Sequence, residues 1–358
     1  MRVVLSVFLL WILAWPCGLF GQGGFRPVIG ELPADSGFAL GVGYRKEQLS
    51  GGAVDIDAKA ILSVKRYEHL ELQVKLPRLA NRRFFAEFGA QYRNYPEENF
   101  WGLGPNSDEG LRTNFRLEDV TISGSGGYRP IDQIRIGATT GYLQANTGPG
   151  KDSGSPTVEH FFSPAQVPGL ARQPDYLFTG AFVEFNSLDV PHDPREGGFY
   201  QFRWTNYDDR DFDAFSFRRY ELTLHRFFPV FRKRGTVAAR GLLSLTDTSP
   251  GQQIPFFMQQ TVGGSADVRG YGQYRFRDAN RVVFNLEYRW AMVEFFDLVA
   301  FGDAGKVFSR RDEFGLDDLR GSLGVGGRLK FRGRVLLGFD LGYSPEGLRF
   351  WLRGSHTF

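Results

Sequence analysis

The stretch NRVVFNLEYRW, residues 280–290, alternates apolar and polar side chains over its length. Successive side chains of a β-strand point to opposite faces, so this period of two predicts a strand with one apolar and one polar face. Residues 334–343 and 348–358 repeat the pattern, and the second of these places Phe350, Leu352 and Phe358 on its apolar face. In 280–290 the apolar set is Val282, Phe284, Leu286, Tyr288 and Trp290.

The same period recurs along most of the chain, in segments of roughly ten residues, the length that a membrane-spanning strand needs. Aromatic residues fall near the strand ends at Tyr288, Trp290, Tyr343 and Phe358, as in the girdles of membrane barrels. Fifteen strands are expected, at 37–46, 53–64, 67–76, 82–94, 113–127, 132–145, 175–186, 197–206, 215–226, 235–246, 280–291, 295–304, 319–331, 333–344 and 347–358.

Connections between these strands alternate between short turns and long polar loops, which is typical of barrels in a bacterial outer membrane. Both ends of such a barrel lie in the periplasm, so the strand number must be even, and 24–33 is the remaining place for a sixteenth strand. Pro27 and Pro33 suit an edge strand there. The sequence therefore predicts an all-β fold, a transmembrane antiparallel barrel of 16 strands. The barrel must close because lipid offers no partner to backbone groups.

The N-terminus and the composition fit export. Residues 1–21 read as a signal peptide, with Arg2 before an apolar run, which leaves 22–358 as a single outer-membrane barrel domain. Lipidation at Cys17, the only cysteine, is the competing interpretation, although the bulky Trp15 and rigid Pro16 before it are unsuited to a lipidation site. A formal charge of +3 with scattered basic residues argues against a nucleic-acid partner.

One long outer loop contains GGSADVRGYGQYRF, residues 263–276, and the strand 295–304 runs into FGDAG at 301–305. VRGY at Val268, Arg269, Gly270 and Tyr271 resembles the in-folded loop motif of the outer-membrane assembly-factor superfamily, the BamA/TamA and bacterial surface antigen type. FGDAG is similar to that family's FxDxG, and five strands follow the loop, as in the family. The stretch FWGLGPNS at 100–107 also resembles sequences of this superfamily.

The resemblance implies that the loop folds back into the barrel and that Arg269 meets its inner wall. Strand alternation places Glu287, Phe301 and Asp303 on the inward face, so both carboxylates are expected partners and Phe301 is expected to stack on the guanidinium. Gly305 completes the strand motif. A mobile loop with an exposed Arg269 is the alternative.

Two further segments carry a weaker resemblance. The C-terminal alternation of Phe350, Leu352 and Phe358 resembles the signal that the barrel-assembly machinery reads, although an aromatic residue can also simply anchor a strand at the interface. DVPHDPREGG, residues 189–198, resembles the family's turn before a strand and is equally compatible with an ordinary tight turn. Family members generally carry periplasmic POTRA modules, and this chain is expected to lack them.

Enzyme signatures such as GxSxG and HExxH are missing from the sequence, so neither catalytic residues nor a cofactor is expected. The five histidines are dispersed, and no metal site is predicted. An outer-membrane hydrolase would need a serine close to a histidine on the outer wall. Ser216 and His225 instead fall on opposite faces of one expected strand.

The resemblance implies an outer-membrane barrel that assembles, inserts or translocates proteins or lipids by opening a seam between 24–33 and 347–358. Outer-membrane lipid, the barrel-assembly machinery and a separate periplasmic protein that delivers clients are the expected partners. A passive, porin-like channel is the alternative, because polar residues line the lumen.

Overall fold

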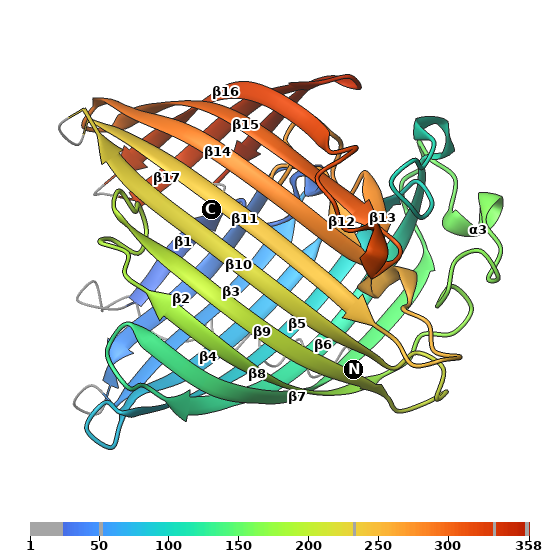
Figure 1. The fold of residues 1–358 in the computed structure, drawn as a ribbon, viewed down its shortest axis with the longest axis horizontal. Coiled ribbons are helices and arrows are strands. Elements are labelled where there is room, and N and C mark those ends of the chain that lie inside the picture. Colours follow the sequence, from blue (N-terminus) through green and yellow to red (C-terminus); the bar gives the residue numbers. More distant parts are fainter. Residues whose placement is uncertain (1–23, 50–52, 232–233, 332–333, 355–357) are drawn as a thin grey trace.

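The computed structural model describes residues 24–49, 53–231, 234–331, 334–354 and 358. The expected signal peptide and Cys17 lie outside the described residues. Sixteen antiparallel strands form one sheet that curls into a nearly closed barrel, which confirms the predicted fold (Figure 1). Among the described residues, no helix is both long enough and apolar enough to cross a membrane.

The barrel strands follow one another around the wall in chain order, and each pairs with the next. They are β1 (Gly24–Ile29), β2 (Ala39–Gln48), β3 (Val54–Ser63), β4 (Glu68–Leu79), β5 (Phe84–Phe100), β6 (Thr113–Tyr128), β7 (Ile134–Pro149), β8 (Tyr176–Asn186), β9 (Gly197–Asp209), β10 (Phe217–Val230), β11 (Gly235–Asp247), β14 (Asn280–Val293), β15 (Phe296–Phe308), β16 (Arg320–Phe331), β17 (Arg334–Ser344) and β18 (Gly347–Arg353).

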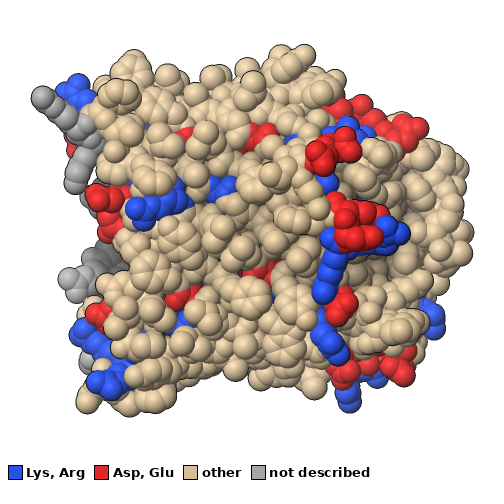
Figure 2. Space-filling view, viewed as in Figure 1, with Lys and Arg blue, Asp and Glu red and all other residues tan. Residues whose placement is uncertain are grey.

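The two faces of the wall differ as the alternation predicts. On β14, Phe284 and Leu286 are exposed on the outer wall, whereas Asn285 and Glu287 are buried on the inner one. Figure 2 shows the result on one side of the molecule: a broad band with few charged residues separates charged groups at the two ends of the barrel. A wall that is apolar outside and polar inside suits a barrel in lipid around a polar interior.

The long connections gather at one end of the barrel, on the right in Figure 1, where the short helix α3 (Val158–Phe161) also lies. The connection 248–279, called here the lumenal loop, contains the 3-10 helix η3 (Phe256–Met258) and a hairpin of β12 (Gln260–Val262) and β13 (Phe276–Asp278). Other 3-10 helices are η1 (Ala34–Ser36), η2 (Glu109–Leu111) and η4 (Arg311–Glu313).

Several strand boundaries differ from the sequence prediction, and two of these differences concern the first and last strands. The first strand ends at Ile29, because Gly30 and Glu31 take positive φ values and turn the chain away, and the last strand ends at Arg353. No backbone ladder joins β1 to β18 in the described part of the chain. The expected strands 24–33 and 347–358 are therefore too long, and the boundary between β1 and β18, called here the seam, is the one place where described neighbouring strands do not pair.

Candidate functional site: the lumenal loop and its charged wall

The lumenal loop is fixed inside the barrel by apolar contacts around its charged tip. Val268 and Tyr271 are buried, and they pack with Phe276 of β13 against Val283 of β14 and Val307 of β15. The rings of Tyr271 and Phe276 meet edge to face, with centroids 5.3 Å apart. Burial of these side chains stabilises the in-folded position, because each removes apolar surface from water.

Arg269, at the tip of this loop, is fully buried against β15. Its Nε and Nη2 donate hydrogen bonds to the two oxygens of Asp303, at 2.8 and 2.7 Å. Its main-chain N–H donates to the same carboxylate at 3.1 Å. A bidentate pair of this kind fixes the direction of the guanidinium as well as its position. The structure thus brings together the VRGY loop and the FGDAG strand.

The guanidinium of Arg269 has two further partners on the inner wall. Its Nη1 donates to Oε1 of Glu287 on β14 at 2.5 Å. Its central carbon lies 3.4 Å from the ring centroid of Phe301, so that the charged plane stacks on the aromatic face. Every polar edge of Arg269 therefore meets a carboxylate and its flat face meets a ring, which offsets the cost of burying the charge.

Small residues let the loop backbone approach the wall. A Cβ on Gly270 would lie 2.6 Å from Cβ of Ser322 and 2.7 Å from Cβ of Ser344, too close for any side chain. A Cβ on Gly342 of β17 would lie 2.5 Å from the carbonyl oxygen of Arg269. At Gly305, a Cβ would lie 3.2 Å from Val268, so this glycine leaves room for the loop. Glycine is required here by close approach.

Sequence reasoning missed several members of this charged cluster. On the wall, Arg328 of β16 donates from Nη1 to Oδ1 of Asp340 of β17 at 2.8 Å, and Arg289 donates from Nε to Glu287 at 2.8 Å. Asp340 alternates with apolar neighbours along β17, which fits a place on the inner face, but alternation does not show which strands meet across the lumen. The cluster comprises Arg269, Arg289, Arg328 and Arg353 with Glu287, Asp303 and Asp340.

The last two strands hold the loop through its backbone. The indole Nε1 of Trp351 on β18 donates to the carbonyl oxygen of Arg269 at 2.7 Å. The hydroxyl of Ser344, at the end of β17, donates to the carbonyl oxygen of Gly270 at 2.8 Å. The carbonyl groups of two successive residues at the loop tip are thereby attached to β17 and β18.

FWGLGPNS, residues 100–107, also contacts the lumenal loop. Arg275 donates to the hydroxyl and the carbonyl oxygen of Ser107, both at 2.9 Å, and its guanidinium carbon lies 5.5 Å from the ring centroid of Trp101. The N–H of Gly104 donates to the carbonyl oxygen of Arg277 at 2.8 Å. Three segments that resemble the family therefore meet in the lumen.

A family model described as the Omp85 superfamily domain matches residues 49–343, most of the chain. The chain belongs to the Omp85 superfamily. It is accordingly a β-barrel protein of the bacterial outer membrane, like BamA and CdiB. No curated protein sequence matches it at significant similarity.

Solved structures share the fold of this Omp85 barrel. BamA from Haemophilus ducreyi lacking POTRA domains 1–3 matches with a TM-score of 0.69 and 12% identity, over 92% of this chain and 69% of that one. CdiB from Escherichia coli matches with a TM-score of 0.62 and 13% identity, over 94% of this chain and 63% of that one. CdiB from Acinetobacter baumannii matches with a TM-score of 0.56 and 10% identity, over 94% of this chain and 60% of that one. This chain spans less than two thirds of either CdiB.

The Omp85 barrel carries a second charged site at its other end. The β8–β9 connection, residues 187–196 and called here the mouth connection, crosses to the opposite wall. Arg195 pairs with the fully buried Asp297 of β15, and its Nη2 lies 3.1 Å from Asp193. Lys330 of β16 lies 2.7 Å from Asp297 and 3.5 Å from Asp193. The sequence predicted a tight turn at 189–198, either like that of the family or an ordinary one. In the structure this segment bridges strands that are distant in the sheet.

The expected C-terminal signal residues separate into two environments. Phe350 and Leu352 lie on the outer face of β18, 64% and 51% exposed. Phe358 was expected on that same apolar face and at the membrane interface, and this placement is wrong. Its ring lies inside the barrel, 4.9 Å from the guanidinium carbon of Arg240 and 5.3 Å from that of Arg289. Strand β18 ends at Arg353, so the period of two no longer sets the direction of Phe358.

The other candidate residues give no catalytic arrangement. His225 faces inward on β10, with its ring 5.7 Å from that of Phe358, and the hydroxyl of Ser216 accepts from the N–H of Asp209. Over the described ranges, no group of three or more His, Cys, Asp or Glu side chains could hold a metal ion.

Proposed function

We propose that this Omp85 barrel inserts or translocates outer-membrane clients, proteins or lipids, by opening its wall at the seam. The observation that carries the proposal is the missing ladder between β1 and β18. Every other neighbouring pair of barrel strands is joined by a ladder, so opening the wall elsewhere would break many backbone hydrogen bonds in a medium that cannot replace them.

The two sides of the seam approach each other closely where β1 and β18 end. A Cβ on Gly30 would lie 3.3 Å from the nitrogen of Gly354, and a Cβ on Gly354 would lie 2.3 Å from the carbonyl oxygen of Ile29. This point joins the end of β1 to the end of β18. Pro27 further removes one ladder donor from β1.

Obstacles along the barrel axis favour a lateral route over the porin-like alternative. The lumenal loop fills the interior near the long connections, and the mouth connection bridges the walls at the opposite end. A passive channel would need both segments to leave an aqueous path. The barrel-assembly machinery and a periplasmic protein that delivers clients are the partners that this function would use.

A reversible lock at the seam tests the proposal. Ile29→Cys and Leu352→Cys place two thiols on the outer face near the contact point, where both side chains are exposed, and a bifunctional thiol reagent would join them across β1 and β18. Cross-linked cells should lose specific outer-membrane proteins, measured by quantitative proteomics, or change their lipid asymmetry, and cleavage of the linker should restore them. Each single cysteine variant treated with the same reagent is the control. If cross-linked cells keep an unchanged proteome and lipid distribution, a lateral route is wrong.

A further inference from the structure

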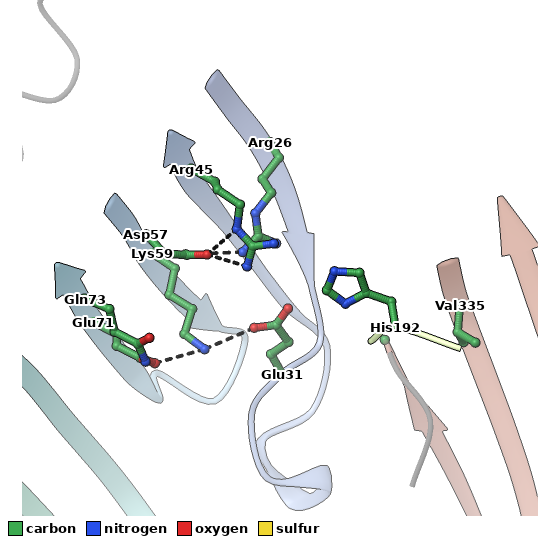
Figure 3. A pocket seen from close by; sticks show the side chains of 10 residues that line it. Arg26, Glu31, Arg45, Asp57, Lys59, Glu71, Gln73, His192 and Val335 are labelled. Carbon is green, nitrogen blue, oxygen red and sulfur yellow. Dashed lines mark hydrogen bonds and ion pairs between the residues drawn. The ribbon is translucent and has the colours of Figure 1, made fainter. Parts of the chain in front are cut away.

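A polar cavity of about 330 Å³ lies against the seam, inside the barrel and away from the lumenal loop. Strands β1 to β4 supply most of its charged lining. The other side is formed by His192 of the mouth connection and Val335 of β17 (Figure 3). Gly354, just after β18, also lines the cavity. The cavity therefore reaches both sides of the seam, whereas the Arg269 cluster lies on β14 to β18.

One half of this seam cavity carries excess positive charge. Arg45 and Arg26 both point at Asp57 of β3, and Nη2 of Arg26 lies 3.5 Å from its Oδ1 (Figure 3). Two guanidinium groups thus share one carboxylate. Nε of Arg26 is buried and makes no hydrogen bond with the described residues. This half can accept a further anionic group.

The other half carries excess negative charge. Lys59 lies 3.2 Å from Glu31 and 3.0 Å from Glu71, so two carboxylates share one ammonium group (Figure 3). Glu71 also accepts a hydrogen bond from Gln73 and lies 3.3 Å from Nε2 of His69, whereas Glu31 pairs with Lys59. Glu31 reaches the cavity because the chain turns inward after β1 with a positive φ. Asp57 and Lys59 are two residues apart on the same face of β3, so the centres of the two halves are about 7 Å apart. The halves form adjacent subsites of opposite sign.

We propose that the seam cavity binds the phosphoethanolamine headgroup of a phospholipid. Its phosphate would lie at Arg26 and Arg45, and its ammonium group, two carbons away, at Glu31 and Glu71. Anionic headgroups such as phosphoglycerol lack the ammonium group and would leave the acidic half unmatched. Charge-assisted hydrogen bonds in a partly buried cavity provide the selectivity.

The position of the cavity identifies a membrane lipid as the source of the headgroup. Outside the seam, Phe25 and Ile29 of β1 are exposed on one side, and Leu336 and Leu352 are exposed on the other. A lipid could keep its acyl chains on this apolar surface while its headgroup passes between β1 and the end of β18. This binding does not depend on which client the barrel moves.

The test is native mass spectrometry of the purified protein, titrated separately with phosphatidylethanolamine, phosphatidylglycerol and free phosphoethanolamine. Phosphatidylethanolamine should bind at least about tenfold more tightly than either of the others, a difference of about 1.4 kcal/mol. Glu31→Gln should lower phosphatidylethanolamine binding and leave or raise phosphatidylglycerol binding, whereas Arg26→Gln should weaken both lipids. Glu87→Gln, at a lumenal carboxylate outside the cavity that pairs with Arg135, is the matched control.

Three outcomes would overturn the proposal: equal binding of the two lipids to the wild type, an equal loss of both in Glu31→Gln, or free phosphoethanolamine binding as tightly as the lipid. The last would assign the cavity to a soluble zwitterion. Heat-modified gel migration of each variant establishes that the barrel is folded. The seam lock gives a separate result, because headgroup binding is measured without transport.

Discussion

Trp351 on the last strand donates a hydrogen bond to the carbonyl oxygen of Arg269 in the lumenal loop, at 2.7 Å. Strand β18 is therefore bonded to β17 on one side and to the loop inside the barrel, while no ladder joins it to β1 among the described residues. Arg353 adds a second link, with Nη1 donating to the carbonyl oxygen of Ser265 at 2.6 Å. Movement of the seam and movement of the loop are physically connected.

Trp351→Phe removes the indole N–H and keeps an aromatic ring. Loss of one buried hydrogen bond of about 1 kcal/mol should raise the opening equilibrium of β18 about fivefold. Hydrogen–deuterium exchange of peptides covering 347–354 should become faster by that factor. Trp290→Phe, at a lipid-facing position on β14, should leave this exchange unchanged. Equal exchange in wild type and Trp351→Phe would show that the bond does not hold the strand.

Arg269→Ala should release the lumenal loop. The variant leaves the buried Asp303 without its bidentate partner and removes one of the cations at Glu287, which should lower the free energy of unfolding by about 3–5 kcal/mol. Conductance in planar bilayers and protease cleavage within 263–276 should both increase. Arg269→Lys keeps the charge without the bidentate geometry, so its conductance and its protease cleavage should lie between those of the wild type and those of Arg269→Ala. Wild-type conductance and proteolysis in Arg269→Ala would contradict the structural role of this cluster.

Arg195→Gln should open the mouth connection. The variant removes one of the two cations that join Asp193 to Asp297 and leaves Lys330, so the connection should leave the opposite wall more often. We expect a several-fold increase in conductance and new protease cleavage within 187–196. Arg210→Gln, in an exposed pair with Asp208 on an outer loop, serves as the control. No change in either measurement would mean that the connection does not restrict the mouth.

Asp35, in η1 beside the seam, should make stability depend on pH. Burial raises the pKa of this carboxyl, although Arg112, Lys65 and Arg349 oppose the shift. The folded state therefore favours the protonated carboxyl. Its contribution to the free energy of unfolding is fully present at low pH and is lost as the pH rises through the pKa of the group in the folded state.

Asp35→Asn cannot ionise, so its melting temperature should exceed that of the wild type at pH 7, and the difference should shrink toward pH 4. Thermal melts at both pH values test this, with Asp132→Asn in an exposed turn as the control. A wild type that is more stable than Asp35→Asn at pH 7 would reverse the expected sign.

The contact of Arg269 with Asp303 and Glu287 could be expected from alternation together with the family resemblance. Alternation along β14 and β15 sets which side chains face inward, and the resemblance of VRGY and FGDAG to the superfamily's motifs implies that the loop brings Arg269 to them. Asp340 and Arg328 were not selected, since their meeting with Arg269 depends on the registers of β16 and β17 against β15. Trp351 alternates with the exposed Phe350 and Leu352 and lies on the inner face, but its bond to the loop backbone has no sequence signal.

The sequence by itself determined the antiparallel barrel strands, the apolar outer wall and the inward faces of β14 and β15, because a period of two is a local property of the extended chain, and the requirement for an even strand number supplied the sixteenth strand. Only the tertiary structure decided where the first and last strands end, that the ring of Phe358 lies inside the barrel, and that residues 187–196 reach Asp297. It also decided the two oppositely charged halves of the seam cavity. Each of these depends on how the sheet closes on itself, which brings together strands that are far apart in the chain.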